Sequence, residues 1–211
     1  MIRRTRAAFL AALSALSVGA LAAPAADANV LSLLPGMCAG QSESQPFAQF
    51  GDQNEYTLVP GGNFEGSMTP WSLSGGARMS AGNESYNVGG AGDSGSLSLP
   101  AGSSATSPFL CTDIYHPTSR LFARNTGSPS SRLTVYVTYP TLVGLMTTTR
   151  IGTISATSSW QPTAVDSLGL NNLLATLNLL GKTEVAFRFA PADSTGNWSI
   201  DDVYLDPFGR S

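Results

Sequence analysis

The stretch that decides the fold lies near the C-terminal end and reads Asn197-Trp198-Ser199-Ile200-Asp201-Asp202-Val203-Tyr204-Leu205-Asp206-Pro207. It predicts a closing strand that carries two carboxylates. A second stretch, Leu58-Val59-Pro60-Gly61-Gly62-Asn63-Phe64-Glu65-Gly66, predicts a turn that leads into a short strand with one carboxylate. Because the termini of a domain often lie close together, we expect these acidic oxygens to gather at one edge of a β-sandwich. That arrangement suits a hard cation such as Ca²⁺.

Between these two stretches the chain reads as a series of short strands separated by Gly-rich and Pro-rich turns. Many short strands with turns between them are typical of a sandwich or a barrel. The expected domain spans residues 57–208, and residues 29–56 are expected to form an irregular arm packed on it. The predicted strands cover residues 71–80, 94–99, 118–124, 132–139, 147–154, 160–165, 184–189 and 198–205.

Two of these strands alternate clearly and define a candidate binding surface. In residues 132–139 the apolar side chains share one face, which we expect to be core, and Thr134, Tyr136 and Thr138 share the other. In residues 184–189 the side chain of Arg188 points away from the apolar face. A sugar ring stacks its apolar face on an aromatic side chain while polar neighbours bind its hydroxyls. Tyr136 and Arg188, with the two threonines, therefore form the most binding-like surface that the pattern predicts.

Other aromatic side chains give weaker candidates for such a surface. Tyr86 and Tyr115 lie in predicted loops and are a second choice. The three tryptophans, Trp71, Trp160 and Trp198, each flank a strand and are expected to pack in the core.

One segment departs from the strand pattern. Residues 171–180 place leucines at helical spacing, and Gly181 follows as a candidate C-terminal cap. The pattern predicts one short amphipathic helix that covers an end of the sandwich. A membrane-surface helix is the alternative, but the polar face lacks the Lys and Arg residues that such helices carry.

The first 28 residues have the layout of a bacterial export signal. Arg3, Arg4 and Arg6 precede an apolar run, and Ala26-Asp27-Ala28 forms a small-x-small cleavage site. Cleavage after Ala22 and a retained membrane anchor are the alternatives. The chain is therefore predicted to be secreted, with no membrane insertion after cleavage.

The charge of the chain and its cysteines indicate which partners and which covalent links to expect. Without residues 1–28 the chain has 8 basic and 13 acidic residues, and no basic patch stands out, so nucleic acid is not an expected partner. Cys38 and Cys111 are the only cysteines, and an even count in an exported chain favours a disulfide. Two free thiols or a metal site are the alternatives, although two cysteines with one histidine make a poor metal set.

The opening Asn63-Phe64-Glu65, the following Trp71 and the closing Ile200-Asp201-Asp202-Val203 resemble bacterial carbohydrate-binding modules of the galactose-binding-like jelly-roll type. The resemblance covers roughly residues 57–207 and implies an all-β jelly-roll sandwich. It also implies one structural Ca²⁺ held between the first and last strands. Glu65 and either Asp201 or Asp202 would then be ligands.

Two patterns suggest catalysis without completing a catalytic set. Gly92-Asp93-Ser94-Gly95 copies the tetrapeptide around a protease nucleophile, but the single histidine, His116, lies in no matching motif. Asp93 is read instead as a turn residue, or as a further oxygen ligand if its loop reaches the cation. A glycosidase needs two carboxyls facing one open cleft, whereas adjacent residues such as Asp201 and Asp202 point to opposite faces of a strand unless a bulge intervenes. We therefore expect one of the two aspartates to face the cation and the other to face solvent.

The sequence thus predicts an exported, non-catalytic domain that binds carbohydrate or a cell-surface glycan. A structural or adhesion protein that uses the same fold to bind protein partners is the alternative, and a hydrolase is the remote one.

Overall fold

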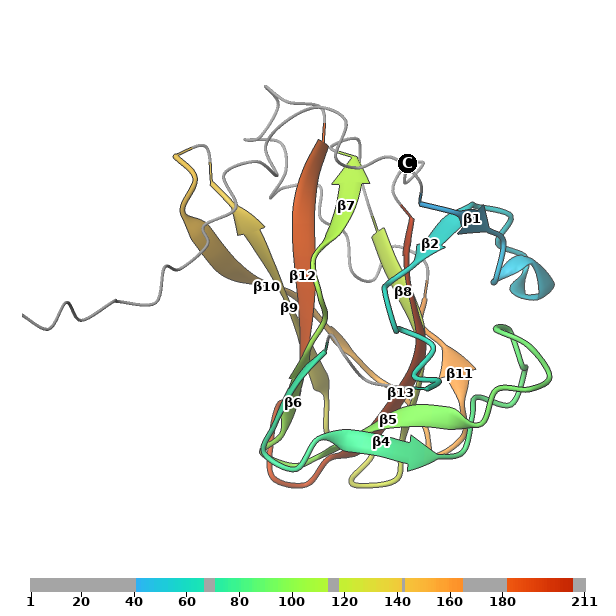
Figure 1. Ribbon diagram of the computed structural model, residues 1–211. Coiled ribbons are helices and arrows are strands. Elements are labelled where there is room, and N and C mark those ends of the chain that lie inside the picture. The colour runs from blue at the N-terminus through green and yellow to red at the C-terminus, as the bar shows by residue number, and fades with distance from the viewer. Residues whose placement is uncertain (1–40, 67–70, 114–117, 142, 165–181, 207–211) are drawn as a thin grey trace, which may run out of the picture.

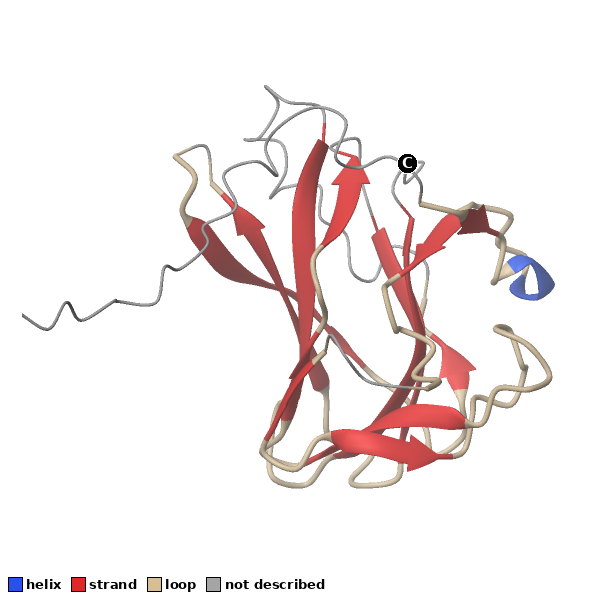
Figure 2. Ribbon diagram, in the orientation of Figure 1, coloured by secondary structure: helices blue, strands red, loops and turns tan. Residues whose placement is uncertain are grey.

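The computed structural model describes residues 41–66, 71–113, 118–141, 143–164 and 182–206. Over these residues the chain forms two antiparallel sheets that pack face to face, as in a jelly-roll sandwich (Figures 1 and 2). The only helix in this part is a single 3-10 turn, Ala48–Phe50. The predicted signal peptide and the predicted helix over residues 171–180 lie outside the described residues, so both stay predictions.

The first sheet has seven strands, and its central strand is the C-terminal stretch that carries Asp201 and Asp202. The path runs β1-β2-β13-β5-β4, with β8 beside β13 and β11 beside β8. The strands are β1 (Glu43–Ser44), β2 (Tyr56–Leu58), β4 (Arg78–Ala81), β5 (Gly95–Pro100), β8 (Thr118–Asn125), β11 (Gln161–Pro162) and β13 (Asn197–Asp206).

The second sheet has six strands, and the strand that carries Arg188 lies at its centre. The path runs β10-β9-β12-β6-β3, with β7 also paired to β12. The strands are β3 (Ser72–Ser74), β6 (Ser104–Thr106), β7 (Leu110–Asp113), β9 (Leu133–Pro140), β10 (Met146–Ile154) and β12 (Lys182–Pro191).

The predicted strand over residues 71–80 is two strands in the structure. The turn at Gly75-Gly76 carries the chain from one sheet to the other, because β3 pairs with β6 and β4 pairs with β5. The other strands in that series are found with shifts at their ends. The short strand predicted to carry Glu65 is wrong, because the chain turns at residues 60–63 and Glu65 lies in no strand. The short strands β6 and β7 were not predicted, because their Ser-rich and Pro-flanked sequence shows no clear alternation.

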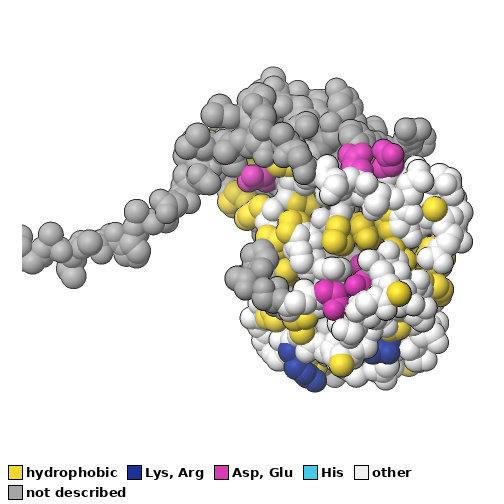
Figure 3. Space-filling model, turned by 45° about the vertical axis from the view of Figure 1, so that its right-hand side comes forward, with side chains coloured by type: hydrophobic (Ala, Val, Ile, Leu, Met, Phe, Trp, Pro, Cys, Tyr) yellow, Lys and Arg dark blue, Asp and Glu magenta, His cyan; other side chains and the backbone are white. Residues whose placement is uncertain are grey.

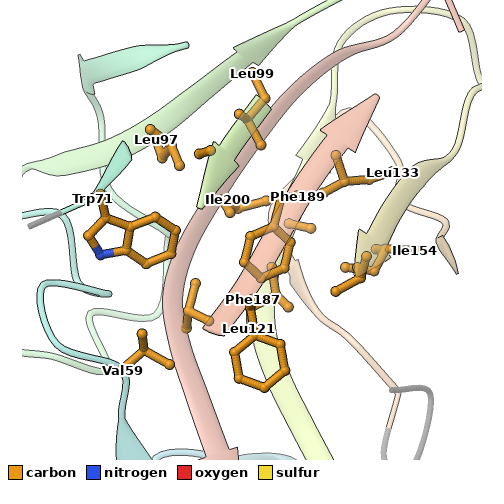
Figure 4. Packing of buried hydrophobic residues seen from close by; sticks show 14 of the residues in the cluster. Val59, Trp71, Leu97, Leu99, Leu121, Leu133, Ile154, Phe187, Phe189 and Ile200 are labelled. Atoms are coloured by element: carbon orange, nitrogen blue, oxygen red, sulfur yellow. The ribbon is translucent and has the colours of Figure 1, made fainter. Parts of the chain in front are cut away.

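The main core lies between the sheets, and both predicted alternation patterns supply it. Leu133, Val135 and Val137 of β9 are buried, as are Val185, Phe187 and Phe189 of β12. Trp71, Leu97, Leu121 and Ile200 come from the other elements around them (Figure 4). Full burial of each such side chain contributes about 1.5–3 kcal/mol to folding, so this cluster is the main source of stability.

A second apolar cluster lies on the opposite side of the seven-stranded sheet. On β8, Leu121 belongs to the main core, whereas its neighbour Phe122 packs with Phe47, Tyr56, Trp160 and Tyr204. The Phe47 ring stacks on that of Phe122 with centroids 5.5 Å apart. Residues 45–55, which connect β1 to β2 on the right of Figure 1, pack on the outer face of this sheet through Phe47 and Phe50.

The predicted disulfide reaches beyond the described residues. Cys111 lies on β7 and is 9% exposed, and no cysteine in the described part of the chain is free. Its predicted partner, Cys38, lies outside that part, so the pairing stays a prediction. Among the described residues, no helix is long and apolar enough to cross a membrane.

If Cys38 and Cys111 are joined, the oxidised protein will not react with a thiol reagent after denaturation, and the reduced protein will react at two sites. Reduction should also lower the free energy of unfolding by about 4 kcal/mol, the chain-entropy value for so long a loop. Mass spectrometry of the alkylated protein measures the first result, and urea unfolding measures the second. Two alkylated sites without reduction would show that the thiols are free.

Candidate functional site

A β-bulge in β13 places the two adjacent aspartates. Asp201 lies opposite Phe122 on β8 and Tyr204 lies opposite Arg120, so β13 has one residue more than its partner between these points. The extra residue is absorbed at Asp202, which has a φ of 47°. Aspartate is one of the few non-glycine residues that adopt this conformation readily.

The bulge lies where the neighbour of β13 changes. Residues 197–200 pair with β5, whereas Tyr204 and Leu205 pair with β2. Between these two pairings, β13 is hydrogen-bonded to the turn at residues 59–62. The Val59 N–H donates to the Val203 carbonyl, and the Val203 N–H donates to the Gly62 carbonyl. A Cβ atom at Gly62 would lie 2.9 Å from the Val203 oxygen, so this contact requires glycine. The two stretches that open the sequence analysis thus meet at the bulge.

Both aspartates are buried, with relative exposures of 0% for Asp201 and 1% for Asp202. The expectation that one of them faces solvent is therefore wrong. The physical reason is the bulge itself, which breaks the alternation, together with the loop between β4 and β5 (residues 82–94), which folds over this point. Glu84 and Asp93 from that loop join Glu65, Asp201 and Asp202 to form what we call the carboxylate cluster.

Asp201 is fully engaged in hydrogen bonds. Its Oδ2 accepts from the Glu84 N–H at 2.9 Å, and its Oδ1 accepts from the Asp202 N–H at 2.9 Å. Burial, and next the Asp202 charge, raise the pKa of Asp201. Asp201 therefore fastens the 82–94 loop to the sheet.

Asp202 has no hydrogen bond of ordinary geometry to either carboxylate oxygen, although both atoms are buried. Burial and then the charges of Glu84, Asp93 and Glu65 raise its pKa, to about 7. The backbone of the 82–94 loop lies close against these carboxylates, because a Cβ atom at Gly89 would lie 2.1 Å from Asp93 Oδ2 and 3.3 Å from Asp202 Oδ1. Two unpaired buried oxygens are costly, so this position calls for a cationic or hydrogen-bonding partner.

Asp93 and Asn83 add further buried oxygens without partners. Asp93 Oδ2 and Asn83 Oδ1 make no hydrogen bond, and burial and next the Glu65 charge raise the pKa of Asp93. Asp93 was predicted to be a further oxygen ligand if its loop reached the cation, and the loop does reach the cluster. Glu84 was not predicted, because no motif in the surrounding sequence marks it.

Glu65 has a different environment from Asp202. Its Oε1 accepts from the Gly95 and Ser94 N–H groups, at 2.5 and 2.6 Å, and its Oε2 accepts from the Ser94 hydroxyl at 3.3 Å. The hydrogen bond from the Gly95 N–H, and next those from Ser94, lower the pKa of Glu65. Ser94, the serine of the protease-like tetrapeptide, thus bonds to a carboxylate. His116, its conceivable base, lies outside the described residues.

The described part of the chain holds no set of three Asp, Glu, His or Cys side chains placed to bind a metal ion by themselves. A cation at the cluster would therefore need amide or main-chain oxygens beside its carboxylates. Such mixed oxygen sets are ordinary for Ca²⁺.

A second candidate site lies on the outer face of the six-stranded sheet. Pairing across the strands places Arg150 of β10 and Arg188 of β12 on either side of Tyr136 of β9. The same row continues to Thr106 of β6 and Ser72 of β3. Every residue of this row is exposed or half-buried, so the row, which we call the arginine–tyrosine row, is accessible from outside.

Two side chains of the row, those of Arg188 and Tyr136, lie against each other. The guanidinium carbon of Arg188 lies 5.5 Å from the centre of the Tyr136 ring. Beside the row, the hydroxyls of Thr138 and Thr148 are hydrogen-bonded at 2.8 Å. Thr134 lies on the same side of β9 but is only 7% exposed. The structure therefore brings together Tyr136, Arg188 and Thr138 as predicted, with Thr134 as a mostly buried neighbour.

Arg150 was not found by sequence reasoning. Its placement depends on the register of the β9–β10 hairpin, which includes an irregularity between Arg150 and Gly152. The run of threonines before it shows a strand but not which residue opposes Tyr136.

Tyr86 lies on the other side of the molecule. Its ring packs against Phe50 and Phe122, with centroids 4.8 and 5.6 Å apart, and it belongs to the covered outer face of the seven-stranded sheet. The structure therefore does not bring Tyr86 to Tyr136. Charged side chains are sparse on the face shown in Figure 3, where acidic groups form small separate patches.

No protein-family model matches this chain, and no curated protein does. Solved structures similar to it include the xylanase 10B of Clostridium thermocellum, with its CBM22-1 and GH10 modules complexed with xylohexaose. That match has 13% identity and a TM-score of 0.48, and covers 70% of this chain but 28% of the xylanase chain. The carbohydrate-binding module TmCBM61, complexed with β-1,4-galactotriose, has 14% identity and a TM-score of 0.42, with 70% and 96% covered. The CBM22-1 xylan-binding domain of Paenibacillus barcinonensis Xyn10C has 13% identity and a TM-score of 0.43, with 70% and 91% covered.

Proposed function

We propose that this protein is an exported, non-catalytic domain that binds carbohydrate through the arginine–tyrosine row. The observation that carries this proposal is the row itself, where one tyrosine stands between two arginines on an outer sheet face. The ring of Tyr136 offers an apolar surface to a sugar, and the guanidinium and threonine groups offer donors and acceptors to its hydroxyls. On the other sheet, residues 45–55 cover the part of the outer face around Phe122 and Tyr204.

The test is binding of residues 29–211 to a glycan array and to insoluble polysaccharides. We expect Tyr136→Ala to weaken binding at least about tenfold, or ~1.4 kcal/mol, because the stacking surface is lost. Its melting temperature should stay close to that of the wild type, since the Tyr136 side chain lies outside the core.

The matched control for this test is Tyr86→Ala on the opposite side of the molecule. It should leave binding unchanged. If Tyr86→Ala abolishes binding and Tyr136→Ala does not, the site belongs on the other face. If neither glycans nor polysaccharides bind, the proposed function is wrong.

We also propose that the carboxylate cluster holds a structural Ca²⁺. The support is the unpaired buried oxygens of Asp202, Asp93 and Asn83, which are hard ligands of the kind that Ca²⁺ prefers. Bound Ca²⁺ would neutralise the repulsion among the carboxylates and fix the 82–94 loop. Among the ligands that the sequence predicted, Asp202 has free oxygens, whereas Glu65 and Asp201 already accept hydrogen bonds with both of theirs.

Adhesion to protein partners remains the second candidate function, and one observation favours it. The tip of the β9–β10 hairpin exposes Val143, Leu145 and Met146, with exposed fractions of 80%, 68% and 52%. Exposed apolar side chains gathered at one place often mark a protein contact. Self-association of the mature protein that rises with concentration, without glycan binding, would favour this candidate.

A further inference from the structure

We infer that the ligand of the arginine–tyrosine row is a polyuronide, a polysaccharide whose sugars carry carboxylates. This inference rests on the proposed function and names its substrate class. It starts from the two guanidiniums of the row, those of Arg150 and Arg188, which are both exposed.

Neither guanidinium has an anionic partner or a hydrogen bond within the described part of the chain. The one ion pair there joins Arg120 to Asp52, and other arginines have their own partners. Arg78 and Arg132 donate to main-chain carbonyls, and Arg124 lies over the Trp160 ring. Arg188 contacts only the face of Tyr136. All of its hydrogen-bond donors, and those of Arg150, are therefore available to a ligand.

The surroundings of the row leave its positive charge uncompensated. The strands β3, β6, β9 and β10 contain no acidic residue. On β12 the only one is Glu184, four residues before Arg188 and so ~13 Å away along the strand. In a chain with a formal net charge of −3, two neighbouring unpaired arginines are a local exception. They give this face a charge complementary to an anionic ligand.

The spacing of the two arginines suits a polymer better than a single anion. They are two strands apart, which is ~10 Å between backbones and about the length of a disaccharide unit. A planar guanidinium binds a carboxylate with two parallel hydrogen bonds. A chain laid across the strands would thus place a sugar near Tyr136 and a carboxylate at each arginine.

The experiment compares charged and neutral forms of the same polymers. Binding of residues 29–211 is measured by affinity electrophoresis to polygalacturonate and alginate, and to polygalacturonate whose carboxyls are methyl-esterified. A neutral xylan and a sulfated dextran complete the set. We expect at least about tenfold tighter binding to polygalacturonate or alginate than to the ester. Added salt should weaken the binding, because it screens exposed charges.

Arginine variants test whether the row itself recognises the carboxylates of the polymer. Arg150→Gln and Arg188→Gln should each weaken binding to the uronate polymer about tenfold and weaken binding to the ester by a smaller factor, because only the acid loses a charge-assisted hydrogen bond. Arg78→Gln, an exposed arginine on the other sheet, is the matched control and should change neither. Arg188→Lys keeps the charge but loses the planar fork, so it should restore only part of the affinity. Melting temperatures of all variants should match the wild type.

The other outcomes separate the inference from the function on which it rests. Equal binding to the ester and the acid, lost in Tyr136→Ala, would overturn the polyuronide and keep the carbohydrate site. Equal binding to sulfated dextran and polygalacturonate would overturn it in favour of a general anion-binding surface. No binding to any polymer would overturn both.

Discussion

Replacing Arg120 with alanine is expected to lower the free energy of unfolding by about 3–5 kcal/mol, because it breaks a buried ion pair. Arg120 is 4% exposed on the outer side of β8. One of its terminal nitrogens pairs with Asp52, the remaining guanidinium nitrogens donate to the Thr163 carbonyl, and the guanidinium lies over the Phe47 ring. Removing it leaves the buried Asp52 charge without its partner.

The same pair fastens residues 43–56 to the sheet. Asp52 accepts hydrogen bonds from the Tyr56 hydroxyl and the Asn54 N–H as well as from Arg120. Burial alone would raise the pKa of Asp52, but these bonds together lower it. A carboxylate with a lowered pKa stabilises the fold above its unfolded pKa, and this contribution is lost as pH falls through the folded value. The wild type should therefore lose stability below about pH 4, and Asp52→Asn should lose less over that range.

Urea unfolding measures the Arg120 effect, and a neighbouring arginine supplies the control. Arg124 lies on the same side of β8 over the Trp160 ring but has no ion pair in the described part of the chain. Arg124→Ala should lower the free energy of unfolding by only about 1 kcal/mol. If Arg120→Ala does not fold, Arg120→Met with Asp52→Asn tests the same point, because neutralising both partners costs less than removing one. Equal effects of Arg120→Ala and Arg124→Ala would show that the buried pair is not what holds this region.

The alternation of β9 and β12 explains why the core and part of the candidate binding surface could be predicted. Period-two patterning puts Val135 and Phe187 inside, and it puts Tyr136 and Arg188 outside. That rule needs only the local sequence. The pairing of Arg150 with Tyr136 needs the register of a hairpin, which depends on the length and geometry of its turn.

The carboxylate cluster, in contrast, could not be predicted from the local sequence pattern. Alternation assigns Asp201 and Asp202 to opposite faces, and only a bulge changes this. The bulge lies where β2 replaces β5 beside β13, and that position depends on the arrangement of the whole sheet. Glu84 joins the cluster through the fold of the 82–94 loop, and the hydrogen bond that its main-chain N–H donates to Asp201 spans 117 positions of the sequence. No local pattern carries such a contact.

Asp202→Asn is expected to raise the stability of the metal-free protein and to abolish its stabilisation by Ca²⁺. Burial and neighbouring charges raise the pKa of Asp202 to about 7, from an ordinary value of 3.8. The folded metal-free protein therefore holds more protons than the unfolded chain, and its stability falls as pH rises from about 4 through that value. At pH 8 the neutral asparagine should relieve this cost, which is at most about 4 kcal/mol for a pKa shift of this size. Asparagine also tolerates the positive φ of this position.

The measurement is the melting temperature in EDTA and in excess Ca²⁺, at pH 5 and pH 8. In the wild type, Ca²⁺ at a hundred times its Kd should add about 2.7 kcal/mol. The gain should be larger at pH 8 than at pH 5, because protons compete with the cation. Glu55→Gln, which removes one exposed negative charge, should leave the Ca²⁺ response intact.

Asp201→Asn should change the stability of the metal-free protein in the opposite direction from Asp202→Asn. This contrast decides which aspartate is the ligand. Both Asp201 oxygens accept main-chain N–H groups, so an asparagine would place its NH₂ group against one of those donors. Asp201→Asn should therefore destabilise the protein in EDTA as well as in Ca²⁺, while Asp202→Asn gains stability in EDTA. A Ca²⁺ response that survives in Asp202→Asn would show that Asp202 is not a ligand. Loss of stability in EDTA for Asp202→Asn would show that its carboxylate has a partner that the hydrogen-bond geometry does not reveal.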